Sequence, residues 1–135
     1  MKTRASALAL VGLLSLLSGS SFAAEPALKL VHVTDLVAEM QKGHPVLCDA
    51  NRDAVRQQWG VIPGAKLLSS SSSYDVAKEL PADKGADLVF YCANSRCMAS
   101  HGAADRALKA GYTHVSVLAD GIQGWAKAGQ KTAKP

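Results

Sequence analysis

The chain has 135 residues, with 15 Lys and Arg against 11 Asp and Glu, and apolar residues make up 48% of it. This length suits one domain with one hydrophobic core, and no internal repeat or long linker points to a second. No basic cluster with interleaved aromatic residues is present, which argues against a nucleic-acid partner.

The first 23 residues have the pattern of a cleavable signal peptide. Lys2 and Arg4 form a positive segment, residues 7–17 are apolar and uncharged, and residues 21–23 offer the small side chains that signal peptidase requires. The apolar stretch is short for a membrane span, and no cysteine follows it to carry a lipid anchor. We therefore expect export to a periplasm or to the exterior, with one domain over residues 24–135 that is free of the membrane. Cleavage would leave 13 basic residues facing 11 acidic ones, a net charge of about +2.

Strands and helices alternate along the remaining sequence. We expect strands over residues 29–33, 45–49, 65–68, 87–91 and 114–118. We expect helices over residues 35–42, 74–80, 100–110 and 122–128, with Thr34 capping the first and Ser73, the last serine of a surface loop, capping the second. This alternation predicts an α/β fold of three layers, α/β/α, around a five-stranded parallel sheet.

The segment 88–112 is the most informative part of the chain. An apolar strand stops at Cys92, a short polar loop follows, and a helix of small residues opens near Ser100. Parallel sheets bind their ligands at the carboxyl ends of strands, and a helix N-terminus favours an anion. A thiol in that position is stabilised as the thiolate, which is the reactive form. The pattern predicts that Cys92 is a nucleophile.

The loop after Cys92 is the predicted substrate-binding segment. We expect its backbone amides to bind an anion and its one arginine to add positive charge. The six residues are Ala93, Asn94, Ser95, Arg96, Cys97 and Met98.

Four segments of the sequence resemble the rhodanese-like family, in the order in which that family has them. They are VLCDANR, which resembles the strand leading to an Asp-x-Arg segment; WGVIPGAKLL, with Val61 in place of a histidine; LVFYC, which ends in the active cysteine; and GYTHVSVLADGIQGWAKAG, a closing segment with a glycine-rich turn. The resemblance covers nearly all of the sequence after the signal peptide. It implies a five-stranded parallel sheet between helices.

The resemblance also implies a sulfurtransferase. In the family mechanism, the thiolate that corresponds to Cys92 attacks the outer sulfur of a thiosulfate-like donor and becomes a persulfide, which a thiol or cyanide then takes up. The partners we expect are a small sulfur-containing anion and a thiol acceptor, with a monomer as the working form. We expect no cofactor and no metal, since the spacing of Cys92, Cys97 and His101 matches no common zinc pattern.

The length of the active-site loop and the residue at position 51 depart from the family pattern. The pairs Ala103-Ala104 and Gly111-Tyr112 lie two places later than the common spacing, which predicts a longer loop with Ser100 rather than Met98 as the helix N-cap. Asn51 stands where the family commonly has arginine. We therefore expect the family's salt bridge to be lost or to be made by Arg52.

Cys97 in the active-site loop is a further departure, for which several roles remain open. It can pack inward with Met98, form a disulfide with Cys92, or resolve a persulfide on Cys92. A disulfide would protect or switch off the nucleophile, whereas resolving a persulfide would make the protein a sulfur carrier or redox relay. A thiol–disulfide redox protein that uses Cys92 and Cys97 and a non-catalytic module that binds an anion or a partner are further alternatives. The third cysteine, Cys48, lies in an apolar strand and is predicted to be buried and structural.

Overall fold

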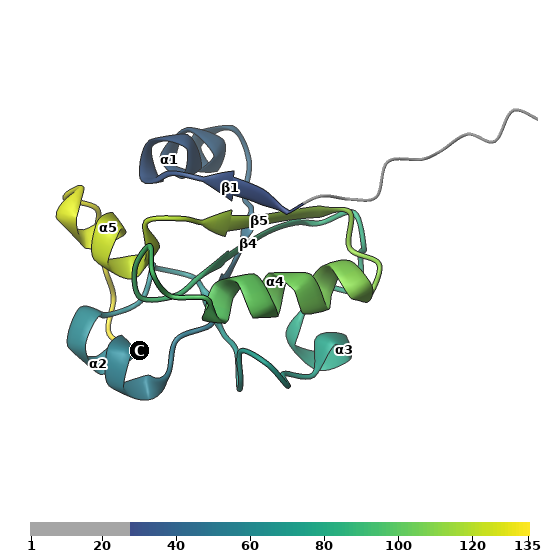
Figure 1. The fold of residues 1–135 in the computed structure, drawn as a ribbon. Coiled ribbons are helices and arrows are strands. Elements are labelled where there is room, and N and C mark those ends of the chain that lie inside the picture. The colour runs from purple at the N-terminus through teal and green to yellow at the C-terminus, as the bar shows by residue number, and fades with distance from the viewer. Residues whose placement is uncertain (1–27) are drawn as a thin grey trace, which may run out of the picture.

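The computed structural model describes residues 28–135, so the predicted signal peptide lies outside the described part of the chain. These residues form a five-stranded sheet in the order β1-β5-β4-β2-β3, with every neighbouring pair parallel. Helices cover both faces of the sheet (Figure 1), which confirms the predicted three-layer α/β/α fold. The strands are β1 (Lys29–Val31), β2 (Val46–Asp49), β3 (Lys66–Leu67), β4 (Asp87–Tyr91) and β5 (His114–Leu118). The helices are α1 (Val33–Lys42), α2 (Asp53–Trp59), α3 (Val76–Glu79), α4 (Ala99–Lys109) and α5 (Gly121–Lys127).

Strand β4 lies at the centre of the sheet and is buried on both faces. Leu88 and Phe90 contribute to one hydrophobic core, while Val89 and Tyr91 contribute to the other. Each of these side chains is at most 2% exposed. A strand that is covered on both faces has a continuous run of apolar residues in its sequence, and this run is why the sequence predicted β4 with its observed bounds.

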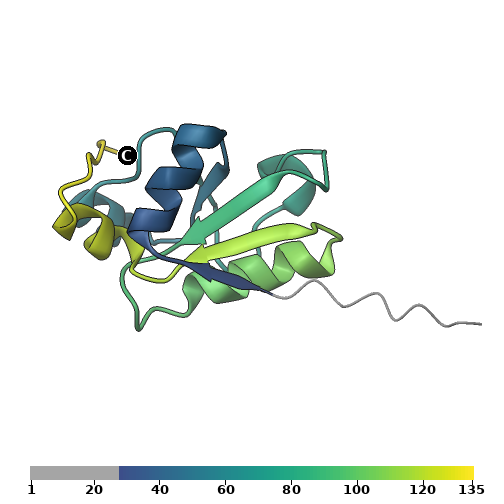
Figure 2. The same cartoon turned by 90° about the horizontal axis from the view of Figure 1, so that it is seen from above.

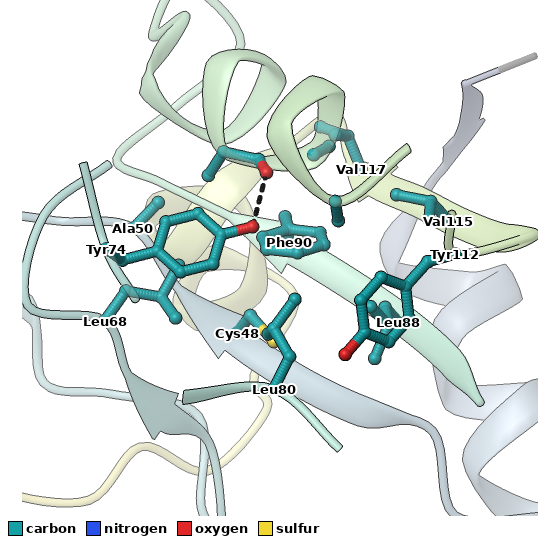
Figure 3. Close-up of a cluster of buried hydrophobic side chains, with 13 residues drawn as sticks. Cys48, Ala50, Leu68, Tyr74, Leu80, Leu88, Phe90, Tyr112, Val115 and Val117 are labelled. Carbon is teal, nitrogen blue, oxygen red and sulfur yellow. Dashed lines mark hydrogen bonds between the residues drawn. The ribbon is translucent and has the colours of Figure 1, made fainter. Parts of the chain in front are cut away.

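The first core lies between the sheet and α4. The helix contributes the small residues Ala103, Ala104 and Ala107, which let its backbone approach the sheet closely. Figure 3 shows Tyr74 beside Phe90 in this core, and its hydroxyl donates a hydrogen bond of 2.8 Å to the carbonyl oxygen of Ala103. This contact ties the loop before α3 to the first turns of α4.

The second core lies on the opposite face of the sheet, beneath α1 and α5. Helix α1 buries Val33 and Leu36 there, and α5 buries Ile122 and Trp125. In Figure 2, α1 lies across this face, and β4 and β5 both run toward the end of the molecule where α5 lies. Helix α5 therefore packs near the carboxyl ends of the central strands. Within residues 28–135, no helix is long and apolar enough to cross a membrane.

The first strand ends earlier than predicted, because α1 begins at Val33 rather than at Asp35. The backbone amide of His32 donates to the Asp35 carboxylate at 3.2 Å, and that of Val33 donates to the Asp120 carboxylate at 3.0 Å. These two aspartates bind the free amides at the start of the helix, so the prediction that Thr34 is the cap is wrong.

The segment between β2 and β4 also differs from the prediction. The expected helix 74–80 is shorter, and its cap is Asp75, whose carboxylate accepts from the amides of the next turn at 3.1 and 3.3 Å. Ser73 is not the cap, because its amide donates to the hydroxyl of Ser70 within the serine loop. Helix α2 was not predicted at all; it ends at Trp59 and is followed by the cap residue Gly60, which has a φ of +77°.

Candidate active site

Strand β4 carries Cys92 at its carboxyl end, in the middle of the sheet. The neighbouring strands are β5 on one side and β2 on the other. Cys92 is 1% exposed, and its carbonyl oxygen accepts a hydrogen bond of 2.9 Å from the amide of Ile122 in α5. The predicted nucleophile therefore lies where parallel sheets place their ligands, with its backbone bonded to α5.

The loop between Cys92 and α4 is anchored on the first turn of α5. The carbonyl oxygen of Ala93 accepts from the amide of Gln123 at 3.0 Å. Gly121 has a φ of +62°, and a Cβ on it would lie 2.6 Å from the backbone of Ala93 and Asn94. Only glycine permits both this backbone conformation and this close approach.

A turn that begins at Asn94 folds the loop back toward Cys92. The carbonyl oxygen of Asn94 accepts from the amide of Cys97 at 3.0 Å, and its side-chain oxygen accepts from the amide of Arg96 at 3.0 Å. Asparagine favours such turns because its side chain bonds the backbone two residues on. In this form, two of the amides predicted to bind an anion are therefore used within the loop itself.

The turn brings Cys97 onto Cys92, and the two form a disulfide with their Cα atoms 6.2 Å apart. Of the roles left open for Cys97, inward packing with Met98 is wrong, because Met98 is 64% exposed. Cys92 is also 1% exposed in this disulfide-bonded form. The structure is thus that of the oxidised protein, in which Cys92 is not free to react.

Ser100 is the residue that sequence reasoning misplaced. Helix α4 begins at Ala99 with Met98 as its N-cap, so the prediction of Ser100 as the cap is wrong. Ser100 is instead 2% exposed, with its hydroxyl oxygen 3.2 Å from the Cys92 sulfur. The sequence did indicate that Ser100 is buried, because it has helical spacing to the buried residues Ala103, Ala104 and Ala107 on the same face of α4. A hydroxyl on that apolar face lies beside the predicted nucleophile.

The other charged or potentially metal-ligating residues near Cys92 lie at the edge of the site. Arg96 is exposed at the tip of the loop. His101 is half-buried with a buried Nδ1 that has no hydrogen-bond partner among the described residues. No cluster of metal-ligating side chains occurs within residues 28–135. Two surface cavities of about 540 and 480 Å³ lie elsewhere, and neither is lined by Cys92 or its loop.

The buried ion pair beside the site is made by Arg56 rather than Arg52. Arg56 donates to the Asp49 carboxylate at 3.3 Å and to the carbonyl oxygens of Asp49 and Leu68 at 3.0 Å. Arg52 is exposed and precedes α2. The expectation failed because the unpredicted helix α2 turns Arg56 back under the ends of β2 and β3. This pair links the two strands on one side of β4.

The third cysteine is structural, as predicted. Cys48 is fully buried, and Figure 3 shows it among the side chains of the first core, near Leu80. Burial raises the pKa of the Cys48 thiol to about 12. It therefore remains a neutral thiol near pH 7 and takes no part in thiol chemistry at the surface.

Comparisons with known proteins agree with this fold. A profile of the rhodanese-like domain family matches residues 32–128, whereas no curated protein matches the sequence. A structure from Bacillus halodurans has a TM-score of 0.65 at 18% identity, covering 78% of this chain and 76% of that one. The rhodanese-like domain of an Anabaena protein has a TM-score of 0.64 at 21% identity, covering 78% and 79%. The thiosulfate sulfurtransferase of Pseudomonas aeruginosa has a TM-score of 0.63 at 22% identity, covering 78% of this chain and 20% of that one.

Structural similarity at these identities demonstrates a shared fold, but it does not demonstrate a shared activity. The family profile, however, spans most of the chain, from the start of α1 to the end of α5. It includes the central strand, Cys92 and the loop that follows. The chain belongs to the rhodanese-like domain family.

Proposed function

We propose that this protein is a sulfurtransferase that moves a sulfane sulfur from a thiosulfate-like donor to a thiol or cyanide, through a persulfide on Cys92. The observation that carries the proposal is the surroundings of Cys92. Its sulfur lies at the carboxyl end of the central strand, near the first turn of α4, with the Ser100 hydroxyl at 3.2 Å. One protein with this fold, from Pseudomonas aeruginosa, is a thiosulfate sulfurtransferase.

The first half of the reaction loads sulfur onto Cys92. Once Cys92 is reduced, its thiolate attacks the outer sulfur of the donor. The sulfur–sulfur bond of the donor breaks, and its electron pair leaves with sulfite. The Ser100 hydroxyl donates to the thiolate, and the N-terminal end of the 11-residue helix α4 adds a favourable dipole. Both favour the ionised form of Cys92 at neutral pH.

The second half unloads the sulfur. An acceptor thiolate or cyanide attacks the outer sulfur of the persulfide, and the electron pair returns to the Cys92 sulfur as thiolate. The backbone amides of loop residues 93–98 bind the anionic donor in this proposal, and the exposed side chain of Arg96 attracts it by its charge. The loop must change from its disulfide-bonded form for the donor to reach a cysteine that is 1% exposed.

A second candidate is a thiol–disulfide redox protein, which the Cys92–Cys97 disulfide favours. Such a protein would cycle the two cysteines between thiols and disulfide without carrying sulfur. For either function, we place the protein in a periplasm or outside the cell, because its first 23 residues have the signal-peptide pattern. Disulfides persist in that environment, so a reducing partner would have to activate the site.

Cyanide assays separate these candidates. Protein reduced with a phosphine and desalted is mixed with thiosulfate and cyanide, and thiocyanate is measured. We expect thiocyanate from the wild type, none from Cys92→Ser, and at least much of the wild-type amount from Cys97→Ser. Thiocyanate formation by Cys92→Ser but not by Cys97→Ser would invert the assignment. Dithiol oxidation without any cyanide-labile sulfur would favour the redox candidate.

A further inference from the structure

We infer that Cys97 resolves the persulfide on Cys92 and releases its sulfur as hydrosulfide, so that external thiols become the electron donors of the reaction. This inference rests on the proposed function, since it requires the Cys92 persulfide. The inference adds a second activity to the proposed sulfur transfer. The protein would convert a thiosulfate-like donor and two thiols into sulfite, hydrosulfide and a disulfide.

The first support is the loop itself, which has the conformation of the product of such a step. The Asn94 turn holds the Cys97 amide at 3.0 Å, and α5 holds the carbonyl oxygens of Cys92 and Ala93 at 2.9 and 3.0 Å. Within this frame the two cysteines are joined directly, sulfur to sulfur. The sulfur within reach of Cys97 is therefore the Cys92 sulfur itself, which is the inner sulfur of a persulfide.

Attack at the inner sulfur sets the products. The Cys97 thiolate forms a bond to the Cys92 sulfur, the bond from that sulfur to the outer sulfur breaks, and the electron pair leaves with the outer sulfur as hydrosulfide. An external dithiol or two monothiols then reduce the Cys92–Cys97 disulfide to two thiols and are oxidised to a disulfide in turn. Attack at the outer sulfur would instead move the persulfide to Cys97, and nothing would be released.

The second support is competition among thiols. Cys97 is tethered five residues from Cys92, whereas an external acceptor must diffuse to it. Tethered groups held in reacting geometry have effective concentrations far above those of thiols in solution. The remaining cysteine, Cys48, is fully buried in the first core and has a raised pKa, so it is no rival for the resolving role.

A single-turnover experiment tests the inference. Reduced, desalted protein is mixed with thiosulfate and no acceptor, and sulfite, hydrosulfide and remaining thiols are measured. For the wild type we expect equal amounts of sulfite and hydrosulfide and loss of both loop thiols. The rate of hydrosulfide release should not depend on protein concentration, because the step is intramolecular. Cys97→Ser should still release sulfite, should lose hydrosulfide release, and should retain the extra sulfur by mass. Cys48→Ala is the matched removal of a thiol and should release hydrosulfide as the wild type does.

The outcomes distinguish this inference from the proposed function. No sulfite from the wild type refutes sulfur loading and the inference with it. Sulfite with a retained persulfide and no hydrosulfide in the wild type refutes only the inference, and so does equally fast hydrosulfide release by Cys97→Ser. If Cys97→Ser and Cys97→Ala both keep their fold by circular dichroism yet release no sulfite, then Cys97 takes part in loading and its separate resolving role is wrong.

Discussion

The Ser100 hydroxyl is predicted to hold Cys92 as a thiolate, and Ser100→Ala removes it with little change in shape. Its oxygen lies 3.2 Å from the Cys92 sulfur, and both residues are at most 2% exposed. A hydrogen bond to a charged group is worth about 1.5 to 3 kcal/mol. Sulfur is a large, diffuse acceptor, so we take the lower end, about 1.5 kcal/mol. That energy corresponds to a roughly tenfold weaker acid, since 1.36 kcal/mol is one pKa unit.

The assay is the rate of alkylation by iodoacetamide as a function of pH, in a Cys97→Ser background where no disulfide can form. The buried thiol of Cys48 does not contribute, so the rate reports Cys92 alone. We expect Ser100→Ala to move the midpoint of the rate profile to higher pH by about one pH unit. Ser72→Ala, a matched change at an exposed serine, should leave the midpoint in place. An unchanged midpoint in Ser100→Ala would show that the hydroxyl does not stabilise the thiolate.

Three further predictions concern the frame around the site. Arg56→Ala leaves the buried Asp49 carboxylate unpaired and should lower the free energy of unfolding in urea by about 3 kcal/mol. Arg52 is exposed, so Arg52→Ala should change that free energy by less than about 0.5 kcal/mol. Equal effects of the two changes would contradict the observed pairing. Burial raises the pKa of the Cys48 thiol from 9.0 to about 12. The free energy of unfolding should therefore fall progressively between pH 9 and pH 12, because only the unfolded chain ionises this thiol there. The fall should be smaller in a Cys48→Ala variant. Gly121→Ala should lower the free energy of unfolding by about 2 kcal/mol or more, because its Cβ would lie 2.6 Å from the backbone of the active-site loop. Gly102 lies in α4 with open space around it, so Gly102→Ala should be neutral or stabilising by up to about 1 kcal/mol.

The sheet was predictable because its central strands are buried on both faces. Strands β4 and β5 have the bounds expected from their apolar runs, and the position of Cys92 follows directly from the end of β4. Helix starts were less predictable, because aspartates distant in sequence or later in the helix bind the free amides. Asp120, for example, binds the amide of Val33 across 87 residues of sequence.

The details of the site depended on packing that spacing does not reveal. Helix α2 has only Val55 and Trp59 half-buried on its apolar side, so its pattern was too weak to predict, and Arg56 was missed with it. The separation of Cys92 and Cys97 allowed a disulfide but also allowed other arrangements. The turn at Asn94 and the contacts with α5 select among them, and these contacts come from a segment about thirty residues later.

The most direct test of sulfur transfer by this chain is peptide mass spectrometry of the reduced Cys97→Ser variant after exposure to thiosulfate. We expect one added sulfur atom on the fragment that carries Cys92, removed by cyanide and missing when Cys92 is also replaced by serine. No added sulfur on that fragment, or added sulfur that survives the loss of Cys92, would contradict the proposed persulfide.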